Sequence, residues 1–170
     1  MQETPLATLS AQPRGVFVAQ LAGIFEHSPW IPERAWAARP FASIDALHAA
    51  MLAVLDAASA EEKLGLIRAH PELAGKEAAA GTLTAASTGE QRGAGLDQCS
   101  ADELARLRQL NAAYQARFGF PFVIAVKGLS RYQIMDAVET RLAHDVATEF
   151  QTCLTEIGKI ARFRLDALLA

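Results

Sequence analysis

One signal for the start of a helix predicts three of the helices in this chain. It is a serine followed three positions later by Glu or Gln, and it stands at Ser59 and Glu62, Ser100 and Glu103, and Ser130 and Gln133. In such a capping box the serine side chain accepts a hydrogen bond from the backbone of the third helical residue, whose own side chain accepts one from the serine N–H. The sequence therefore predicts a helix after each of these serines.

Other apolar patterns predict helices outside the three boxes. Apolar residues at spacings of three and four predict a helix over 16–25, ended by the Ser-Pro pair at 28–29. Ser43 is a good N-cap for a helix that follows it. A last helix is predicted from near Asp145 to the C-terminus. About seven helices are expected in total.

These helices and the lack of hairpin signals predict an all-α fold, a compact single-domain helical bundle. A chain of 170 residues is large enough to bury one core without disulfides or metals. The domain is expected to cover 14–170. Residues 1–13, which contain Pro5 and Pro13, are expected to form a loose N-terminal arm with a few docking contacts.

Residues 120–126, Phe-Pro-Phe-Val-Ile-Ala-Val, break the helical pattern. The run is apolar and rich in β-branched residues, and Gly119 and Gly128 bound it, which by propensity predicts a strand. No second strand-like run exists to pair with it. We therefore expect an extended, buried connector whose backbone groups need partners other than a ladder. A ligand could be one of those partners.

The composition excludes several classes of function. The chain is 51% hydrophobic and 21% charged, which excludes disorder. Sixteen basic and nineteen acidic residues give a net charge of −3, and neither sign forms a run of five, so no nucleic-acid partner is expected. No window of eighteen apolar residues occurs, so no membrane association is expected either. A small-molecule substrate or a protein partner remains.

Targeting, redox and metal signals are sparse. Cys99 and Cys153 are far apart and lack metal-type spacing, so we expect reduced bystander thiols. The first thirty residues lack the pattern of a signal peptide, and a cytoplasmic location is expected. No two histidines stand four positions apart, and the four histidines do not cluster with cysteines, so no metal site is expected.

The stretch with the most chemical content covers 70–91. It begins with His70 and Pro71 and ends with Glu90 and Gln91, so an imidazole and a carboxylate stand twenty positions apart. Pro71 disfavours the helical conformation at His70, so the preceding helix should end at residue 69. The imidazole of His70 would then lie at the C-terminal end of that helix. Glu90 is expected in the first turn of a following helix. The glycines between them argue for a site supported by helices rather than a helix face.

Each candidate residue also has a structural alternative. His70 could be a helix-terminal histidine hydrogen-bonded to nearby carbonyls. Ser87 and Glu90 could form a capping box of their own. Arg162 and Arg164 could be solvated cations that suit the end of the last helix, and segment 120–126 could simply be core. Residue type and spacing leave these alternatives open.

Several separate motifs change this balance when they are taken together. They are Glu26-His27-Ser28-Pro29-Trp30, His70-Pro71-Glu72-Leu73-Ala74-Gly75, Ser87 with Glu90-Gln91 and Ala94-Gly95-Leu96, Asn111-Ala112-Ala113-Tyr114, the run from Arg117-Phe118-Gly119 through Phe120-Pro121-Phe122-Val123-Ile124, and Lys159-Ile160 with Arg164-Leu165. In this order they resemble the 2-oxo-4-hydroxy-4-carboxy-5-ureidoimidazoline (OHCU) decarboxylases of urate breakdown. The resemblance spans about 17–168.

The resemblance implies an all-helical homodimer that converts OHCU to (S)-allantoin and CO2 without a cofactor. It implies that His70 is the catalytic acid/base, since an imidazole with a pKa of about 6.5 gives or takes a proton near neutrality. Glu90 would lie beside it, and Arg164 would hold a carboxylate or ureido carbonyl. Pro71, Ser87 and Gln91 would contact the substrate, together with the backbone of Phe122, Val123, Ile124, Ala125 and Val126.

Two other functions stay open at this point. One is a helical ligand-binding or scaffold protein that keeps the fold without turnover. The other is a lyase or hydrolase that acts on a different ureido compound. A histidine that points away from Glu90 would favour the first, and substrate profiling separates the second.

Overall fold

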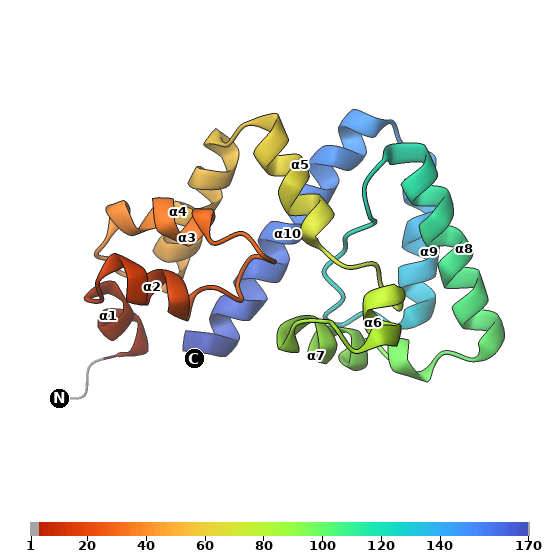
Figure 1. Cartoon of the computed structure of the whole chain (residues 1–170), viewed down its shortest axis with the longest axis horizontal. Coiled ribbons are helices and arrows are strands. Elements are labelled where there is room, and N and C mark those ends of the chain that lie inside the picture. The colour runs from red at the N-terminus through yellow and green to blue at the C-terminus, as the bar shows by residue number, and fades with distance from the viewer. Residues whose placement is uncertain (1–3, 170) are drawn as a thin grey trace. The chain divides into compact units, whose positions relative to one another are not determined.

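The computed structural model describes residues 4–169, and within them the chain forms ten α-helices and no strand (Figure 1). The helices are α1 (Pro5–Ser10), α2 (Arg14–Gln20), α3 (Trp30–Ala35), α4 (Ile44–Ala57), α5 (Ala60–Ala69), α6 (Lys76–Ala80), α7 (Ala85–Gly93), α8 (Ala101–Phe118), α9 (Arg131–Arg141) and α10 (Val146–Leu169). Two 3-10 turns, η1 (Trp36–Ala38) and η2 (Leu96–Gln98), complete the elements. The all-α prediction is confirmed.

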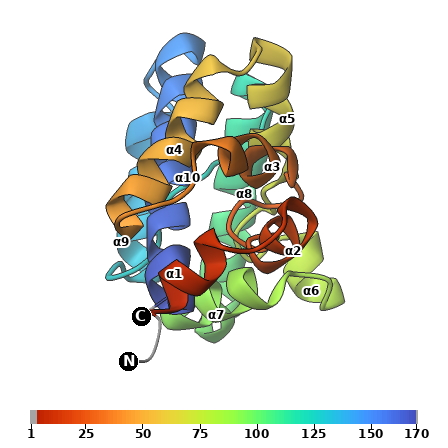
Figure 2. The same ribbon diagram turned by 90° about the vertical axis from the view of Figure 1, so that its left-hand side faces the viewer.

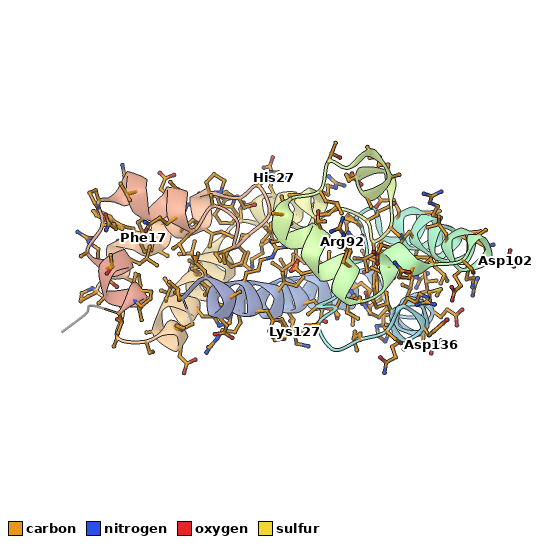
Figure 3. All side chains as sticks on the ribbon, turned by 90° about the horizontal axis from the view of Figure 1, so that it is seen from below. Phe17, His27, Arg92, Asp102, Lys127 and Asp136 are labelled. Carbon is orange, nitrogen blue, oxygen red and sulfur yellow. The ribbon has the colours of Figure 1, made fainter. Side chains whose placement is uncertain are left out.

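The chain divides into two compact units, and α10 contributes to both. Unit 1 comprises the described residues 4–69 with 158–169. In it α3 packs on α2 and α4 (Figure 2). Its core includes Phe17, labelled in Figure 3, with Leu47 and Met51, and none of these side chains is exposed. Gly158 lets α10 approach α4 closely, because a Cβ there would stand 3.2 Å from a methyl of Leu52.

Unit 2 comprises residues 70–157, and α8 and α9 lie side by side in it (Figure 1). Tyr114 of α8 is fully buried at the centre of an aromatic cluster. Its ring centroid lies 4.6 Å from that of Phe118, 6.1 Å from that of Phe120 and 5.3 Å from that of Phe122. The contacts with Phe120 and Phe122 are edge-to-face, an arrangement that adds stability beyond the area it buries. Segment 120–126 thus packs against α8.

The predicted capping boxes are present. At Ser100 and Ser130 both reciprocal hydrogen bonds form, which start α8 and α9. At Ser59 the backbone N–H donates to Glu62 Oε1 at 3.2 Å, and the Ser59 hydroxyl accepts from the Glu62 N–H at 3.1 Å. Ser43 caps α4 as predicted. Gly119 ends α8 in the left-handed conformation, with φ of 79°.

The structure has three more helices than the seven expected, and short helices of five or six residues account for the difference. One of them, α1, lies inside the segment expected to be a loose arm. Thr4 caps it, Pro5 stands at its first position, and Leu9 is 3% exposed. Residues 1–3 of that arm lie outside the described residues. Another, α6, forms within the stretch that the glycines were expected to keep irregular.

Segment 120–126 is extended and unpaired with any strand in the described part of the chain, as predicted. All of its side chains except that of Ile124 are buried. The neighbouring α10 begins at Val146, where the Asp145 carboxylate accepts a hydrogen bond from the Thr148 N–H at 2.7 Å. Among residues 4–169 no helix is long and apolar enough to cross a membrane.

Candidate functional site

His70 is the first residue after α5, as the Pro71 signal predicts, and it is 7% exposed. The chain then makes a tight turn in which the Gly75 N–H donates to the Glu72 carbonyl at 3.2 Å. Only glycine fits at 75, because a Cβ there would lie 2.8 Å from the Glu72 Cβ. Ala74 in the same turn has a positive φ of 52°. A non-glycine residue adopts that conformation only where its surroundings hold it.

Two side chains from neighbouring helices hold this turn. Gln91 of α7 accepts a hydrogen bond from the Ala74 N–H through its Oε1, at 2.9 Å. Asn111 of α8 donates through Nδ2 to the Leu73 carbonyl at 3.0 Å. Gln91 and Asn111 are both buried. The loop that leaves His70 is therefore tied to two helices, and the Gln91 side-chain oxygen is engaged by the protein backbone.

Helix α7 starts earlier than predicted. Its N-cap is Thr84, whose hydroxyl accepts a hydrogen bond from the Ser87 N–H at 3.2 Å. The alternative of a capping box at Ser87 and Glu90 is therefore wrong, and Glu90 lies in the second turn of α7 rather than the first. Ser87, Glu90 and Gln91 stand at spacings of three and four, so they share one face of the helix. Ser87 and Gln91 are 6% exposed.

Two backbone groups of segment 120–126 are bound by charged side chains. The Val123 carbonyl accepts a hydrogen bond from Arg141 Nη1 at 2.7 Å, and the Ala125 N–H donates to Glu156 Oε1 at 3.3 Å. Phe122, Val123, Ala125 and Val126 are buried, while Ile124 is half-buried. The backbone groups of this segment were expected to need partners other than a neighbouring strand. Side chains of the protein itself supply two of those partners.

Arg164 lies in unit 1 and is buried, with 8% of its side chain exposed. It donates through Nη2 to Glu26 Oε1 and through Nη1 to the Gly23 carbonyl, both at 3.0 Å. The alternative of a solvated helix-end cation is wrong for Arg164. It suits Arg162 better, which is about one-third exposed and pairs with Asp45 and Asp166.

Glu26 stands in the first of the family motifs, but no role was predicted for its side chain. Its side chain is 1% exposed and pairs with Arg164. The turn that carries it has His27 at a positive φ of 46° and a hydrogen bond from the Ser28 hydroxyl to the Glu26 carbonyl at 2.8 Å. His27 itself is exposed, and Figure 3 shows its place on this turn. An acidic residue inside an apolar run, just before a Ser-Pro pair, was the available signal.

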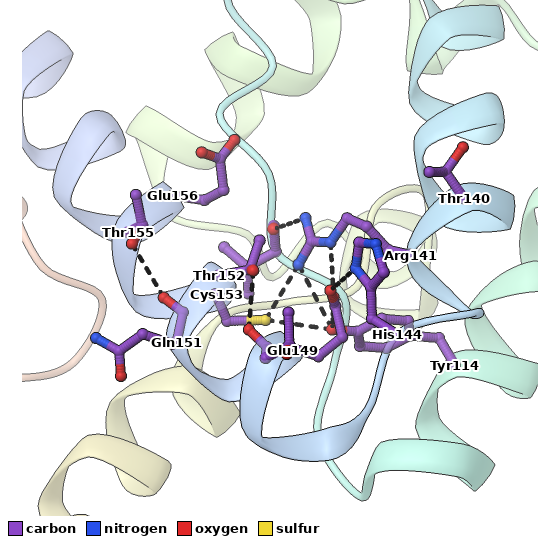
Figure 4. Close-up of polar contacts among 12 residues, drawn as sticks. Tyr114, Thr140, Arg141, His144, Glu149, Gln151, Thr152, Cys153, Thr155 and Glu156 are labelled. Atoms are coloured by element: carbon purple, nitrogen blue, oxygen red, sulfur yellow. Dashed lines mark hydrogen bonds and ion pairs between the residues drawn. The ribbon is translucent and has the colours of Figure 1, made fainter.

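The structure also contains a second buried polar cluster that was not predicted from the sequence. Figure 4 shows Tyr114, Arg141, His144 and Cys153 gathered around the carboxylate of Glu149. Burial raises the pKa of Glu149, but hydrogen bonds from Tyr114, His144 and Arg141 outweigh burial and hold that pKa below its ordinary value. Burial and the neighbouring thiol and carboxylate raise the pKa of the Tyr114 phenol. The cluster therefore holds an ionised carboxylate and a neutral phenol at neutral pH.

Metal ligation has no candidate among the described residues. Within 4–169 no group of three or more His, Cys, Asp or Glu side chains is placed to hold a metal ion. The polar groups of unit 2 that were singled out from sequence are an imidazole, a hydroxyl, a carboxylate and an amide. Such groups suit hydrogen bonding to a small polar molecule and proton transfer.

Comparison with known proteins places this arrangement in a family context. The model of the OHCU decarboxylase family matches residues 10–166. A 2-oxo-4-hydroxy-4-carboxy-5-ureidoimidazoline decarboxylase of Haloferax volcanii is 42% identical over 165 residues, covering 97% of this chain and 96% of that protein. The uric acid degradation bifunctional protein PucL of Bacillus subtilis is 46% identical over 149 residues, which are 88% of this chain and 29% of that protein.

A solved structure agrees with these sequence matches. The crystal structure of an (S)-allantoin synthase superposes with a TM-score of 0.76 at 29% sequence identity. The superposition covers 98% of this chain and 54% of that one. The similarity therefore extends over nearly the whole of the chain described above.

Proposed function

Because the chain belongs to the OHCU decarboxylase family, we propose that it is a carboxy-lyase that converts 2-oxo-4-hydroxy-4-carboxy-5-ureidoimidazoline to (S)-allantoin and CO2 in urate breakdown. The observation that carries this proposal is a 7%-exposed imidazole, His70, in a loop fixed by Gln91 and Asn111. A fixed, buried acid/base is what a stereospecific protonation needs.

The reaction breaks one C–C bond and forms one C–H bond. Loss of CO2 from the ring carbon that carries the hydroxyl leaves an electron pair, which the adjacent C=N group takes up as its nitrogen is protonated. The hydroxyl then loses its proton as its carbon becomes a ring carbonyl. A proton delivered to one face of the neighbouring carbon, which carries the ureido group, gives the S product. We assign the acid/base role to His70 and the role of hydrogen-bonding this imidazole or the substrate hydroxyl to Glu90. Both residues belong to unit 2.

Substrate contacts are assigned by the same family resemblance. Ser87 and Gln91 would offer polar groups from α7, and Pro71 would wall the pocket. The Gln91 oxygen already accepts from Ala74, so its amide NH2 is the group offered to the substrate. The backbone of 122–126 would face the ring and the ureido arm, with Ile124 as the half-buried side chain of that segment.

Arg164 would fix a carboxylate or ureido carbonyl of the substrate. A guanidinium is planar and permanently charged, so it holds such a group in a defined orientation. Glu26 and the Gly23 carbonyl hold the Arg164 side chain in place. Most of the rate enhancement would then come from positioning and charge placement.

The test follows (S)-allantoin by circular dichroism while the substrate is generated enzymatically from urate. We expect His70→Ala to lower kcat by about 100-fold or more, and Glu90→Ala to lower it strongly, because general acid–base catalysis contributes about 10²–10⁴-fold. His48→Gln is the matched control, since His48 Nε2 lies 2.8 Å from the Gly158 carbonyl in unit 1 and has no assigned role. Formation of (S)-allantoin by His70→Ala at the wild-type rate would contradict the mechanism.

Assembly and location complete the proposal. The family resemblance implies a homodimer, and a cytoplasmic location agrees with the sequence signals discussed above. Light scattering on the purified protein measures the first, and fractionation of the producing cells measures the second. Turnover of a panel of other ureido compounds, or binding of (S)-allantoin without any turnover, would favour the two alternative functions.

A further inference from the structure

The extended segment 120–126 is held by a side chain to which the proposed mechanism gives no role. Arg141 of α9 donates through Nη1 to the Val123 carbonyl at 2.7 Å. Its guanidinium carbon also lies 4.2 Å from the ring centroid of Phe122, within the range of a cation–π contact. One buried cation thus holds both the backbone and a side chain of the segment.

The guanidinium is itself held from several sides. Its Nε donates to Glu149 Oε1 at 2.7 Å, and its Nη2 lies 3.5 Å from the Tyr114 hydroxyl and 3.4 Å from Cys153 Sγ. These partners come from α8 and from the first half of α10 (Figure 4). Because the Arg141 guanidinium is planar and has partners on several sides, only one orientation of it satisfies them all.

Glu149 is the centre of the arrangement. Its carboxylate is fully buried and accepts a hydrogen bond from the Tyr114 hydroxyl at 2.6 Å, while His144 Nδ1 lies 2.9 Å from its other oxygen. Two acceptor oxygens therefore have three donors, which satisfies the charge without solvent. Glu149 fixes Arg141, and Arg141 in turn fixes Val123.

Stability alone is a weak reason for such a cluster. A buried ion pair contributes little net stability compared with well-packed apolar residues of similar volume, because both charges lose their hydration. The ion pair instead fixes the register of the segment, that is, the direction in which its carbonyl and N–H groups point. The Val123 carbonyl is held by an Arg141 guanidinium that cannot rotate, in a segment that has no neighbouring strand. The adjacent peptide groups of the segment then point in fixed directions.

We propose that Arg141, held by Glu149 and Tyr114, is a positioning residue that sets the register of segment 122–126 for substrate binding. This inference rests on the proposed decarboxylase function, in which that segment faces the ring and ureido arm. All the groups it invokes belong to unit 2. Because the segment binds substrate and does not transfer the proton, loss of its register raises KM more than it lowers kcat.

The test is a graded series of variants, each assayed for KM and kcat and titrated with (S)-allantoin by calorimetry. Arg141→Lys keeps the charge but cannot reach Glu149 and Val123 together, and we expect KM and the Kd for (S)-allantoin to rise about tenfold. Glu149→Gln keeps the shape and should raise both about threefold. Tyr114→Phe removes one donor and should have the smallest effect. The pH profile of kcat should not move in any of them.

Arg131→Lys is the matched control, because Arg131 pairs with Glu103 at 3.2 Å in the same unit and has no role in the site. Partial unfolding, followed by urea titration, lowers the active fraction and hence kcat without changing KM. If Arg141→Lys does not fold, Glu149→Gln and Tyr114→Phe decide the matter. KM and Kd within twofold of wild type in the folded variants overturn the inference.

Failure of the proposed function looks different. Wild-type protein that forms no (S)-allantoin above the uncatalysed rate would remove both the function and the inference that rests on it. An active wild type whose variants keep their KM would remove the inference alone.

Discussion

Two buried arginine–glutamate pairs, one in each unit, use the same residue types for different ends. Arg164 bonds to Glu26 and to the Gly23 carbonyl, so both of these contacts lie on a single turn. Arg141 bonds to Glu149 of α10 and to the Val123 carbonyl, so it joins separate elements. In each pair the arginine side chain is 8% exposed and the carboxylate is almost fully buried.

The two pairs differ in which elements supply the partners of the carboxylate. The Glu149 carboxylate also accepts a hydrogen bond from the Tyr114 hydroxyl, and His144 Nδ1 lies 2.9 Å from it. Its loss would therefore leave donors without an acceptor on α8, on α9 and just before α10. Glu26 accepts from Arg164 at 3.0 Å and lies 3.9 Å from the exposed imidazole of His27, the next residue in the same turn. We therefore expect changes at Glu149 to appear chiefly in stability and substrate binding, and changes at Glu26 to appear chiefly in kcat.

The largest effect is expected for Glu149→Ala. Removing one partner of a buried pair leaves an uncompensated charge, and we expect the free energy of unfolding to fall by about 3–5 kcal/mol. Urea titration followed by far-UV circular dichroism measures it. A loss below about 1 kcal/mol would show that the cluster is hydrated in solution and would remove the contrast with Glu26.

Glu26→Gln is expected to separate activity from stability. The amide keeps the size of the side chain but not its charge, so Arg164 loses its fixed orientation. We expect kcat to fall about 30-fold, while the free energy of unfolding falls by only about 1–2 kcal/mol. Steady-state assays and urea titration on one preparation measure both quantities. An unchanged kcat would mean that Glu26 does not orient Arg164 for catalysis.

Removing both charges of the second pair should restore stability without restoring binding. We expect Arg141→Met combined with Glu149→Leu to be within about 1–2 kcal/mol of wild type, since no buried charge is left alone. KM should stay raised because Val123 has lost its donor. If the double variant recovered the wild-type KM, packing rather than the Arg141 fork would set the segment.

Acid should weaken unit 2 through Glu149. Its pKa in the folded protein is lowered, so its contribution is present above the unfolded pKa of about 4.5 and is lost as the pH falls through the folded value. We expect the unfolding free energy to fall more steeply with acid below about pH 5 in wild type than in Glu149→Gln. Urea titrations at several pH values measure the two slopes, and equal slopes would contradict the assignment.

Glu103 supplies a surface counterpart to that pH effect. Hydrogen bonds from the Ser100 N–H, Tyr132 and Arg131 lower its pKa to about 2, so its contribution is lost between about pH 4.5 and pH 2. Glu103→Gln should flatten the acid slope only within that window, and by less than Glu149→Gln. Solvent reaches and screens the half-buried Arg131–Glu103 pair, whereas Glu149 is fully buried. The same titrations, extended to pH 2, measure this.

Helix starts were predictable because they depend on a few neighbouring residues. The boxes at Ser59, Ser100 and Ser130 each form as predicted, since both partners of each hydrogen bond lie within four positions. The same local reasoning misplaced α7, where Thr84 competes with Ser87 as the cap and lies earlier in the chain. It also missed α1 and α6, because helices of five or six residues give almost no periodicity.

The sequence by itself determined the all-helical class, the end of α5 at His70 and the single extended segment, because these follow from Pro, Gly and capping residues acting on their neighbours. Its ordered motifs also pointed to the family. Only the tertiary structure decided that Glu26 faces Arg164 and that Glu149 gathers Arg141, Tyr114 and His144. Those pairings join residues from 5 to 138 positions apart, and packing alone brings them together.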